Sequence, residues 1–344
     1  MRTAVVICPG RGSYTKSEIG YLSRYHIDKF DMLAGFDAER RALGQEELLA
    51  LDGASSYSLA RHTRGDNASP LIYACTLCDF LSIDHDKIAV VAVTGNSMGW
   101  YSALACAGAL SPRAGFEVVN TMGTLMQEQL TGGQLIYPFV GEDWRADPAR
   151  RAELMALAAR IGAMPGQRLA LSIDLGGMLV LAGDEAGLSA FMAAVPPVEG
   201  RFPMRLANHA AFHTPLQAPA AEAGRARLGT DLFGPPSLPL IDGRGAIWWP
   251  GATEVSALRD YTLGHQVTEP YDFTRAVRNA AREFAPDVFI ITGPGSTLGS
   301  AVAQSLIIEG WRGMRSKADF IALQEAAPLL IFMGIGEQRA AVTR

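Results

Sequence analysis

Short apolar runs alternate along this chain with longer stretches of helical periodicity. The runs at residues 2–8, 88–93 and 288–292 predict buried strands, because each is too short for a helix and ends near glycine. Helical spacing of apolar residues is found at 71–81, 101–110, 114–130, 273–284 and 298–306. Strands that alternate with helices in this way predict an α/β fold with a parallel sheet.

The pattern changes at the glycine pair 132–133, which breaks the chain. The elements that follow are expected in the order strand, helix, strand, strand, helix, strand, at 134–140, 147–161, 168–174, 178–182, 185–194 and 201–206. This order is that of a small ferredoxin-like domain. We therefore expect a large, hydrolase-like parallel-sheet domain of residues 1–131 and 208–344, with residues 132–207 inserted as a ferredoxin-like small domain.

Two further predictions concern the segment between the first two strands. Apolar spacing predicts helix from Ser17 to about Leu51, and the next helix is expected to begin near Asn67, with Pro70 in its first turn. A C-x-x-C pair at residues 75 and 78 lies inside that apolar helix. We expect these cysteines to be buried thiols, because a zinc site would need a second pair of ligands.

Composition and charge narrow the class of function. The 344 residues are 49% hydrophobic and 19% charged, as in an ordinary globular protein. The net charge is −5 and no basic stripe is present, which argues against nucleic-acid binding. No apolar run reaches the roughly 18 residues of a membrane span, and no signal peptide is evident, so we expect a cytoplasmic protein.

The strongest chemical signal is Gly95-Asn96-Ser97-Met98-Gly99, a G-x-S-x-G sequence between a predicted strand and a predicted helix. That context is typical of a nucleophile elbow, in which the serine occupies a strained backbone conformation at a sharp turn. Both glycines are expected because a β-carbon would clash with the neighbouring strand or helix. The helix N-terminus would point free N–H groups toward the serine.

Ser97 needs a general base, and histidine is the usual one near neutral pH. The three histidines in the first 90 residues lie in a surface helix or in polar segments, which leaves His209, His213 and His265. His213 follows the inserted domain and is well placed to lie over the elbow, with His209 as its competitor. His85 lies between two aspartates, but a solvated loop is the better interpretation, and we expect no metal site.

No aspartate is spaced to complete a triad with the histidine. A backbone carbonyl or an amide side chain would serve instead, and Gln266 is the candidate. For the oxyanion we expect two backbone N–H donors. Met98 of the elbow supplies one, and Arg11, in the glycine turn after the first strand, supplies the other.

Five segments, in this order over nearly the whole chain, resemble motifs of the malonyl-CoA:acyl-carrier-protein transacylase family, which includes polyketide synthase acyltransferase domains. They are similar to the family's P-G-Q-G-S, G-H-S-L-G, R-G-x-x-M-Q, A-F-H-S-P-L and G-P-G-x-x-L, and lie at residues 9–13, 95–99, 122–127, 211–216 and 293–298. The resemblance implies a ping-pong acyl transfer through acyl-Ser97, with His213 as base and Gln266 in the loop that orients it. It also implies acyl-CoA and a phosphopantetheinyl acyl carrier protein as substrates and partners, no permanently bound cofactor, and a monomer.

The departures from the family pattern predict a changed acyl pocket. The family arginine that binds the malonyl carboxylate falls at Met122, which offers apolar surface in place of a charged clamp. A carboxylate buried there would lose its counter-ion. Asn96 and Trp100 replace a family histidine and glutamate, and with Met122 and Phe212 they are the expected pocket residues. We expect a wider, more apolar entrance that favours an uncharged or longer acyl chain over malonyl, and malonyl loading to rise in Met122→Arg.

Met122 and Arg11 each allow two interpretations. Met122 is either core packing or a change of acyl specificity, and we favour the second. Arg11 replaces the family glutamine of the first loop. Either its side chain faces solvent and only its backbone matters, or its guanidinium replaces the missing clamp from another wall; we favour the first.

We therefore expect an acyltransferase that moves an acyl group other than malonyl between CoA or carrier-protein thioesters. The alternative is an acyl hydrolase of the same fold, which would use the same Ser97–His213 pair with water as the acceptor. A general α/β-hydrolase is disfavoured by the inserted domain and by the absence of a suitably spaced acid before the histidine. A non-enzymatic scaffold is disfavoured because both catalytic residues are present.

Overall fold

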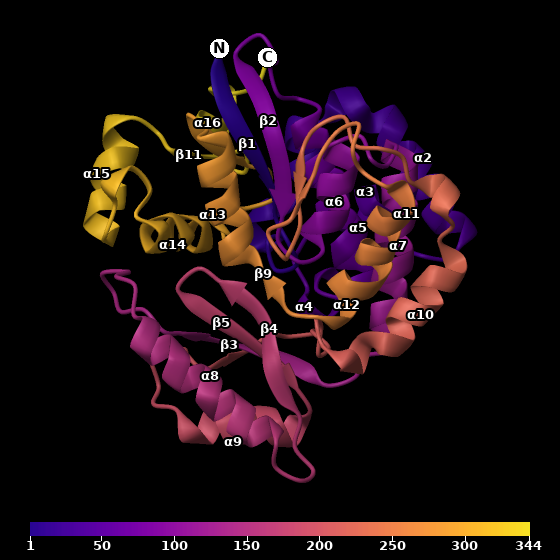
Figure 1. Ribbon diagram of the computed structural model, residues 1–344. Helices are drawn as coiled ribbons and strands as arrows, with labels where there is room; N and C mark the ends of the chain where they lie inside the picture. The colour runs from indigo at the N-terminus through magenta and orange to yellow at the C-terminus, as the bar shows by residue number, and fades with distance from the viewer.

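The computed structural model describes residues 1–344, which form two β-sheets surrounded by helices (Figure 1). The larger sheet has the strand order β11-β10-β1-β2-β7-β8, and all neighbouring pairs are parallel except β7 and β8. Its strands are β1 (Arg2–Cys8), β2 (Ile88–Gly95), β7 (Leu240–Ile241), β8 (Ile247–Trp248), β10 (Val288–Ile291) and β11 (Leu330–Phe332). The predicted α/β fold with a parallel sheet is confirmed.

The smaller sheet has the strand order β6-β3-β5-β4-β9. Helices α8 (Pro148–Gly162) and α9 (Glu185–Ala194) lie on its outer side at the bottom of Figure 1. Its strands are β3 (Gly133–Pro138), β4 (Leu169–Leu175), β5 (Met178–Gly183), β6 (Met204–Arg205) and β9 (Tyr271–Asp272). The order from β3 to β6 is the predicted one, but β9 comes from well beyond residue 207 and pairs in parallel with β4, so the two parts of the chain share this sheet.

Helices flank the larger sheet on both sides in Figure 1, with α5, α6 and α7 on one side and α13 and α14 on the other. The α-helices outside the smaller sheet are α1 (Tyr21–Tyr25), α2 (Phe30–Ala42), α3 (Leu48–Asp52), α4 (Leu59–His62), α5 (Gly65–Phe80), α6 (Gly99–Cys106), α7 (Pro112–Glu128), α10 (Ala218–Arg227), α11 (Val255–Asp260), α12 (Gln266–Thr268), α13 (Phe273–Phe284), α14 (Gly299–Glu309), α15 (Lys317–Ala326) and α16 (Gly336–Ala340). Short 3-10 turns occur at Lys16–Glu18, Ile27–Lys29, Pro215–Gln217, Thr230–Leu232 and Trp311–Gly313, and a π-helical turn at Tyr261–His265. None of the helices has both the length and the apolar character of a membrane span.

Two helix predictions near the N-terminal end of the chain are wrong. The expected helix from Ser17 to Leu51 is divided into shorter helices, and left-handed glycines lie at two of the breaks, Gly20 (φ 79°) and Gly44 (φ 69°). Helix α5 begins at Gly65, so Pro70 lies inside it. Pro70 cannot donate to the carbonyl of Asp66, four residues earlier, and the buried Arg40 guanidinium donates to that carbonyl instead (2.8 Å).

The packing of α5 explains why the proline is tolerated there. Nearly every residue of this helix is buried, and it packs along α7 in the core of the larger part of the molecule. Cys75 and Cys78 are fully buried and free, so the prediction of core thiols is confirmed. Tertiary contacts therefore decide the limits of α5 more than the local sequence does.

The parallel sheet brings the two loops of the predicted site together. Cys8 at the end of β1 lies in register with Gly95 at the end of β2. The carboxyl ends of parallel strands meet at one edge of the sheet, where open α/β folds bind their ligands. The glycine turn of residues 9–13 and the elbow of residues 95–99 consequently lie side by side.

Candidate active site

The elbow has the geometry that its two glycines predict. Ser97 lies between β2 and α6 with φ 56°, in the left-handed region that non-glycine residues rarely occupy. A β-carbon on Gly95 would lie 2.2 Å from the carbonyl oxygen of Gly99, and one on Gly99 would lie 2.2 Å from that of Cys8. The predicted requirement for glycine at both positions is confirmed.

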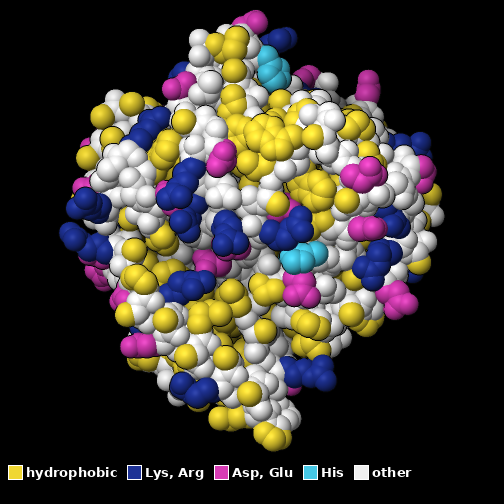
Figure 2. Space-filling model, viewed as in Figure 1, with side chains coloured by type: hydrophobic (Ala, Val, Ile, Leu, Met, Phe, Trp, Pro, Cys, Tyr) yellow, Lys and Arg dark blue, Asp and Glu magenta, His cyan; other side chains and the backbone are white.

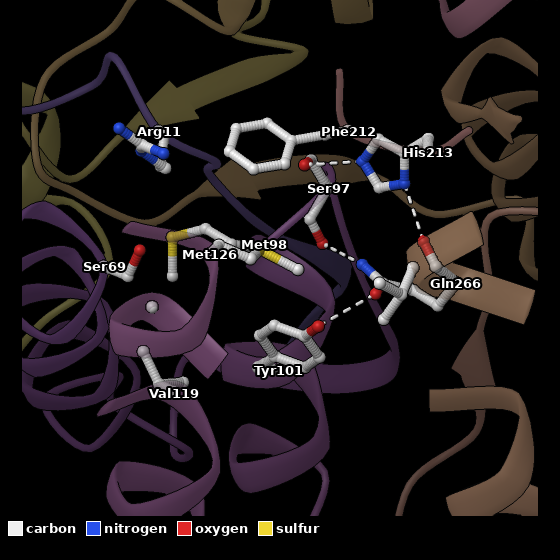
Figure 3. A pocket seen from close by; sticks show the side chains of 12 residues that line it. Arg11, Ser69, Ser97, Met98, Tyr101, Val119, Met126, Phe212, His213 and Gln266 are labelled. Carbon is white, nitrogen blue, oxygen red and sulfur yellow. Dashed lines mark hydrogen bonds between the residues drawn. The ribbon is translucent and has the colours of Figure 1, made fainter. Parts of the chain in front are cut away.

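The structure brings His213 to the serine hydroxyl. Ser97 Oγ lies 2.8 Å from His213 Nε2, and His213 Nδ1 lies 2.7 Å from the main-chain oxygen of Gln266 (Figure 3). A carbonyl oxygen only accepts, so Nδ1 carries the proton and Nε2 is free to accept one from Ser97. His213 is buried, and this burial lowers its pKa to about 4 despite the opposing effect of the Gln266 carbonyl. The imidazole is therefore neutral at pH 7, as a general base must be.

The side chain of Gln266 holds the elbow while its backbone holds the histidine. Its Nε2 donates to the carbonyl oxygen of Ser97 (3.0 Å), and its Oε1 accepts from the hydroxyl of Tyr101 (3.0 Å). Gln266 thus connects the serine and the histidine through two different groups. Sequence reasoning placed Gln266 near the histidine but gave no role to Tyr101, whose position two residues after the G-x-S-x-G pattern was the available signal.

His213 itself has φ 57°, and the smaller sheet supports the segment that carries it. The carbonyl oxygen of Phe212 accepts from Ser172 Oγ on β4 (2.8 Å), which in turn accepts from Gln134 Nε2 on β3 (2.6 Å). Gln134 Oε1 lies 2.7 Å from His209 Nδ1. His209 therefore ends a hydrogen-bond chain behind the site, and it does not compete with His213 for Ser97.

Both predicted oxyanion donors are free. The backbone N–H groups of Met98 and Arg11 donate no hydrogen bond within the protein. They belong to the loops that leave β2 and β1, which the sheet register places beside each other. Free N–H groups at this position can stabilise the charge that develops on a carbonyl oxygen under attack by Ser97.

A small cavity opens beside Ser97. Its volume is about 20 Å³, which is enough for about one water molecule. Its lining consists of Arg11, Ser69, Ser97, Met98, Tyr101, Val119, Gly123, Met126, Phe212, His213, Gln266 and Val267 (Figure 3). The cavity is small, and the expected wider entrance stays a prediction.

Of the four predicted acyl-pocket residues, only Phe212 lines the cavity. Met122 is fully buried and its sulfur faces Gly224 of α10. Trp100 is also fully buried, and its Nε1 donates to Thr262 Oγ1 (3.0 Å). The predictions for both residues are corrected accordingly, because motif matching located the elements but could not give the face on which each side chain packs.

Asn96 is the fourth predicted pocket residue, and it also lies outside the lining. It is buried beside the first loop, where a β-carbon on Gly10 would lie 3.4 Å from its Nδ2. The α7 residues that do face the cavity are Val119, Gly123 and Met126, which are spaced by four and three residues along one side of the helix. None of these three carries a charge.

Arg11 also differs from expectation. Its side chain was expected in solvent, but it points into the molecule and lines the cavity. Its Nη2 donates to the main-chain oxygens of Thr63 (2.6 Å) and Asn208 (2.8 Å), and its guanidinium carbon lies 5.4 Å from the centre of the Phe212 ring. Burial lowers the pKa of Arg11 to about 10, so it remains charged at neutral pH. The interpretation in which this side chain faces solvent is wrong.

The curated proteins that are similar in sequence to this chain are malonyl CoA-acyl carrier protein transacylases and polyketide synthases. No protein-family model matches the chain. It is 27% identical over 210 residues to the malonyl CoA-acyl carrier protein transacylase of Salmonella typhimurium. This match covers 60% of this chain and 63% of the relative, which is less than two thirds of that protein. It is 24% identical over 305 residues to the Haemophilus influenzae transacylase, covering 87% and 90%. A Streptomyces halstedii polyketide synthase, GfsA, is 28% identical over 78% of this chain and 3% of the synthase.

Solved structures share the fold. The malonyl-CoA:ACP transacylase of Synechocystis superposes with a TM-score of 0.74 at 17% identity and covers 99% of this chain and 100% of its own. A malonyl-transacylase in complex with a type II polyketide acyl-carrier protein superposes with a TM-score of 0.69 at 22% identity, covering 95% and 100%. The chain therefore has the fold of malonyl-CoA:acyl-carrier-protein transacylases and is similar in sequence to these enzymes and to polyketide synthases.

Proposed function

We propose that this protein is an acyltransferase that carries its acyl group on Ser97 and moves it between thioesters of CoA and an acyl carrier protein. The observation that carries the proposal is the 2.8 Å contact between Ser97 Oγ and a neutral His213. A serine hydroxyl becomes a nucleophile when such a base is in place. Free backbone N–H groups beside the hydroxyl add the means to stabilise a tetrahedral intermediate.

The proposed reaction has two matched halves. In the first, His213 Nε2 takes the hydroxyl proton as Ser97 Oγ attacks the thioester carbonyl, and the carbonyl oxygen accepts from the N–H groups of Met98 and Arg11. The carbon–sulfur bond then breaks, and the departing sulfur takes the proton from His213. In the second half, a new thiol gives its proton to His213 and attacks the acyl-serine, and Ser97 recovers its hydroxyl proton as the carbon–oxygen bond breaks.

We further propose that the preferred acyl group is not malonyl. The family's carboxylate-binding arginine is absent, since Met122 takes its place in the sequence and packs away from the cavity, and the α7 residues that face the cavity are all neutral. A carboxylate close to the thioester would therefore be buried against methionine and valine without a counter-ion, which is unfavourable by several kcal/mol. This supports an acyl group whose first carbons are apolar.

The partner in this proposal is an acyl carrier protein, and the site of action is the cytoplasm. A transacylase of the same fold has been solved with an acyl-carrier protein. On the face shown in Figure 2, Lys and Arg side chains gather across the middle, which favours a donor that carries phosphates, such as CoA or phosphopantetheine. Every group of the proposed machinery comes from one chain, so we propose a monomer with no bound cofactor.

Product analysis tests the proposal. The protein is incubated with a panel of short acyl-CoA thioesters and a carrier protein that bears phosphopantetheine, and the acyl carrier protein is then weighed by mass spectrometry. We expect acylated carrier protein with the unmodified enzyme and with the control Ser189→Ala, whose serine is exposed on α9, and none with Ser97→Ala. Equal transfer by Ser97→Ala would overturn the proposal.

The same experiment decides the second candidate, an acyl-thioester hydrolase. The specific observation in its favour is that the cavity beside Ser97 has room for about one water molecule. Water held there could attack the acyl-serine in place of a thiol, with His213 again as base. Free acid without any acylated carrier protein would show hydrolysis and contradict transfer.

A further inference from the structure

Arg11 forms a charged end of the acyl cavity that the proposed transfer chemistry does not use. Only its backbone N–H takes part in the mechanism above. Its Nη2 donates to two main-chain oxygens, while Nε is buried without any partner and Nη1 donates no hydrogen bond. No carboxylate contacts the guanidinium, because the nearby Asp66 is paired with the exposed Arg64 (2.8 Å).

Ser69 on α5 lies at the same cavity and is also unpartnered. Its side chain is 4% exposed, and its hydroxyl makes no hydrogen bond within the protein. A serine inside a helix usually donates to a carbonyl one turn earlier. Ser69 thus leaves a donor free in the wall of the cavity, beside a cation that lacks a counter-ion.

These groups lie away from the reacting atoms. Figure 3 shows Arg11 and Ser69 at one end of the cavity and Ser97 and His213 toward the other, with Phe212 and Met126 between them. The part of the cavity between the two ends is apolar. Methionine is unbranched and flexible, so Met126 can shift to admit a short chain.

Arg11 is half-buried, and a cation withdrawn from water without a counter-ion is unfavourable, so a bound anion would relieve that cost. We propose that Arg11 and Ser69 bind a carboxylate at the far end of the acyl group. This inference rests on the proposed acyl transfer and makes it more specific, since the preferred substrate becomes the monothioester of a dicarboxylic acid longer than malonic acid, such as succinyl- or glutaryl-CoA. One carboxylate oxygen accepts from Arg11 Nη1 and the other from the hydroxyl of Ser69, while the methylene groups lie along Phe212 and Met126.

The test compares chains that differ only at the far end. The rates of acyl-Ser97 formation from succinyl- and glutaryl-CoA are measured against neutral acyl-CoA thioesters of the same length, and against malonyl-CoA. We expect the longer carboxylated chains to load at least about tenfold faster than their neutral counterparts. Equal or faster loading of the neutral chains, or a preference for malonyl over both, would overturn the inference.

Two variants test whether Arg11 and Ser69 cause the preference for carboxylated chains. Arg11→Gln keeps the backbone N–H and removes the charge, and it is expected to bring the ratio of carboxylated to neutral loading close to one. Ser69→Ala is expected to lower the same ratio several-fold, and it decides the matter if Arg11→Gln does not fold. The control Arg160→Gln removes an exposed positive charge on α8, outside the cavity, and should leave the ratio unchanged.

The ratio of carboxylated to neutral loading distinguishes a failure of this inference from a failure of the proposed function. An unchanged ratio in both variants would overturn the role of Arg11 and Ser69, although the acyl-enzyme still forms. If no thioester of any kind labels Ser97, the acyl-transfer proposal itself fails. The ratio is also independent of any general loss of rate that either variant causes.

Discussion

Burial sets the protonation state of His213, the proposed base. The imidazole lies in an apolar setting that disfavours its charged form, and the Gln266 carbonyl opposes this only in part. The result is a base with its proton on the nitrogen away from Ser97. Arg11, at the other end of the cavity, shows the contrasting case, because a guanidinium stays charged even when burial lowers its pKa to about 10.

The pH dependence of acylation tests the state of His213. A base works only when it is deprotonated, and a pKa lowered to about 4 keeps it so across the neutral range. We expect kcat/KM for acyl-enzyme formation to stay level from pH 8 to about pH 5 and to fall with a midpoint near pH 4. Stopped-flow release of CoA at a series of pH values measures this, with circular dichroism to show that the fold persists. A midpoint near the ordinary histidine value of about 6.5 would contradict the description of the site.

The variant Met122→Arg tests whether residue 122 contacts the acyl group, as the motif match predicts, or only packs in the core, as the structure shows. The motif match alone predicts that this change raises malonyl loading. In the structure the side chain faces Gly224 and is fully buried, so an arginine would place an uncompensated charge between α7 and α10. We expect a loss of about 3 kcal/mol in the free energy of unfolding and no gain in malonyl loading. Denaturant titration and a malonyl-CoA loading assay check the two parts, and a stable variant that loads malonyl well would contradict this placement of Met122.

The smaller sheet holds the segment that carries His213. Ser172 on β4 donates to the carbonyl of Phe212, directly before the histidine, and Gln134 on β3 holds Ser172. His213 has a left-handed backbone conformation, so its segment needs such support. The two sheets therefore meet at the residue that carries the base.

Ser172→Ala tests this support. Removing the hydroxyl leaves the Phe212 carbonyl without its donor and allows the histidine to drift from Ser97. We expect kcat to fall about tenfold while KM changes little, and the free energy of unfolding to fall by about 1 kcal/mol. Rescue by Ser172→Thr, which restores a hydroxyl, would support a positioning role. An unchanged kcat in Ser172→Ala would show that the segment holds its conformation without this bond.

The sequence allows the main elements to be predicted where burial leaves a clear pattern. Strands β1, β2 and β10 are continuous apolar runs, and the elbow follows from two glycines around a serine. Strands β8 and β9 have only two residues each, which is too short for any periodicity. The start of α5 was misplaced because Arg40, distant in sequence, satisfies the carbonyl that Pro70 leaves free.

Motif spacing predicts which residues form the site, but it does not predict the directions in which their side chains point. Motif spacing identified Ser97, His213 and Gln266, which the structure brings together. It could not tell that Met122 and Trp100 point away from the cavity, or that Arg11 points toward it, because these directions depend on packing between helices. Met126 belongs to the motif at residues 122–127 and Ser69 to no motif, and for both only the face that their helices present places them at the site.

At the scale of the whole molecule, the fold brings distant parts of the chain to one edge of the larger sheet. Ser97 follows β2, the proposed oxyanion donor Arg11 follows β1, and the proposed base His213 follows the smaller sheet. The carbonyl that accepts from His213 comes from α12. All of these contributions converge on Ser97. We therefore propose that Ser97, and no other residue, carries the acyl group.

Peptide mapping of the acylated protein tests that claim most directly. The protein is incubated briefly with acyl-CoA thioesters that include succinyl- and glutaryl-CoA, quenched with acid, digested and analysed by tandem mass spectrometry. We predict one acyl group per chain on the peptide that contains Gly95 to Gly99, attached to Ser97, and no adduct in Ser97→Ala. An adduct on another residue, or one that persists in Ser97→Ala, would contradict this account of the site.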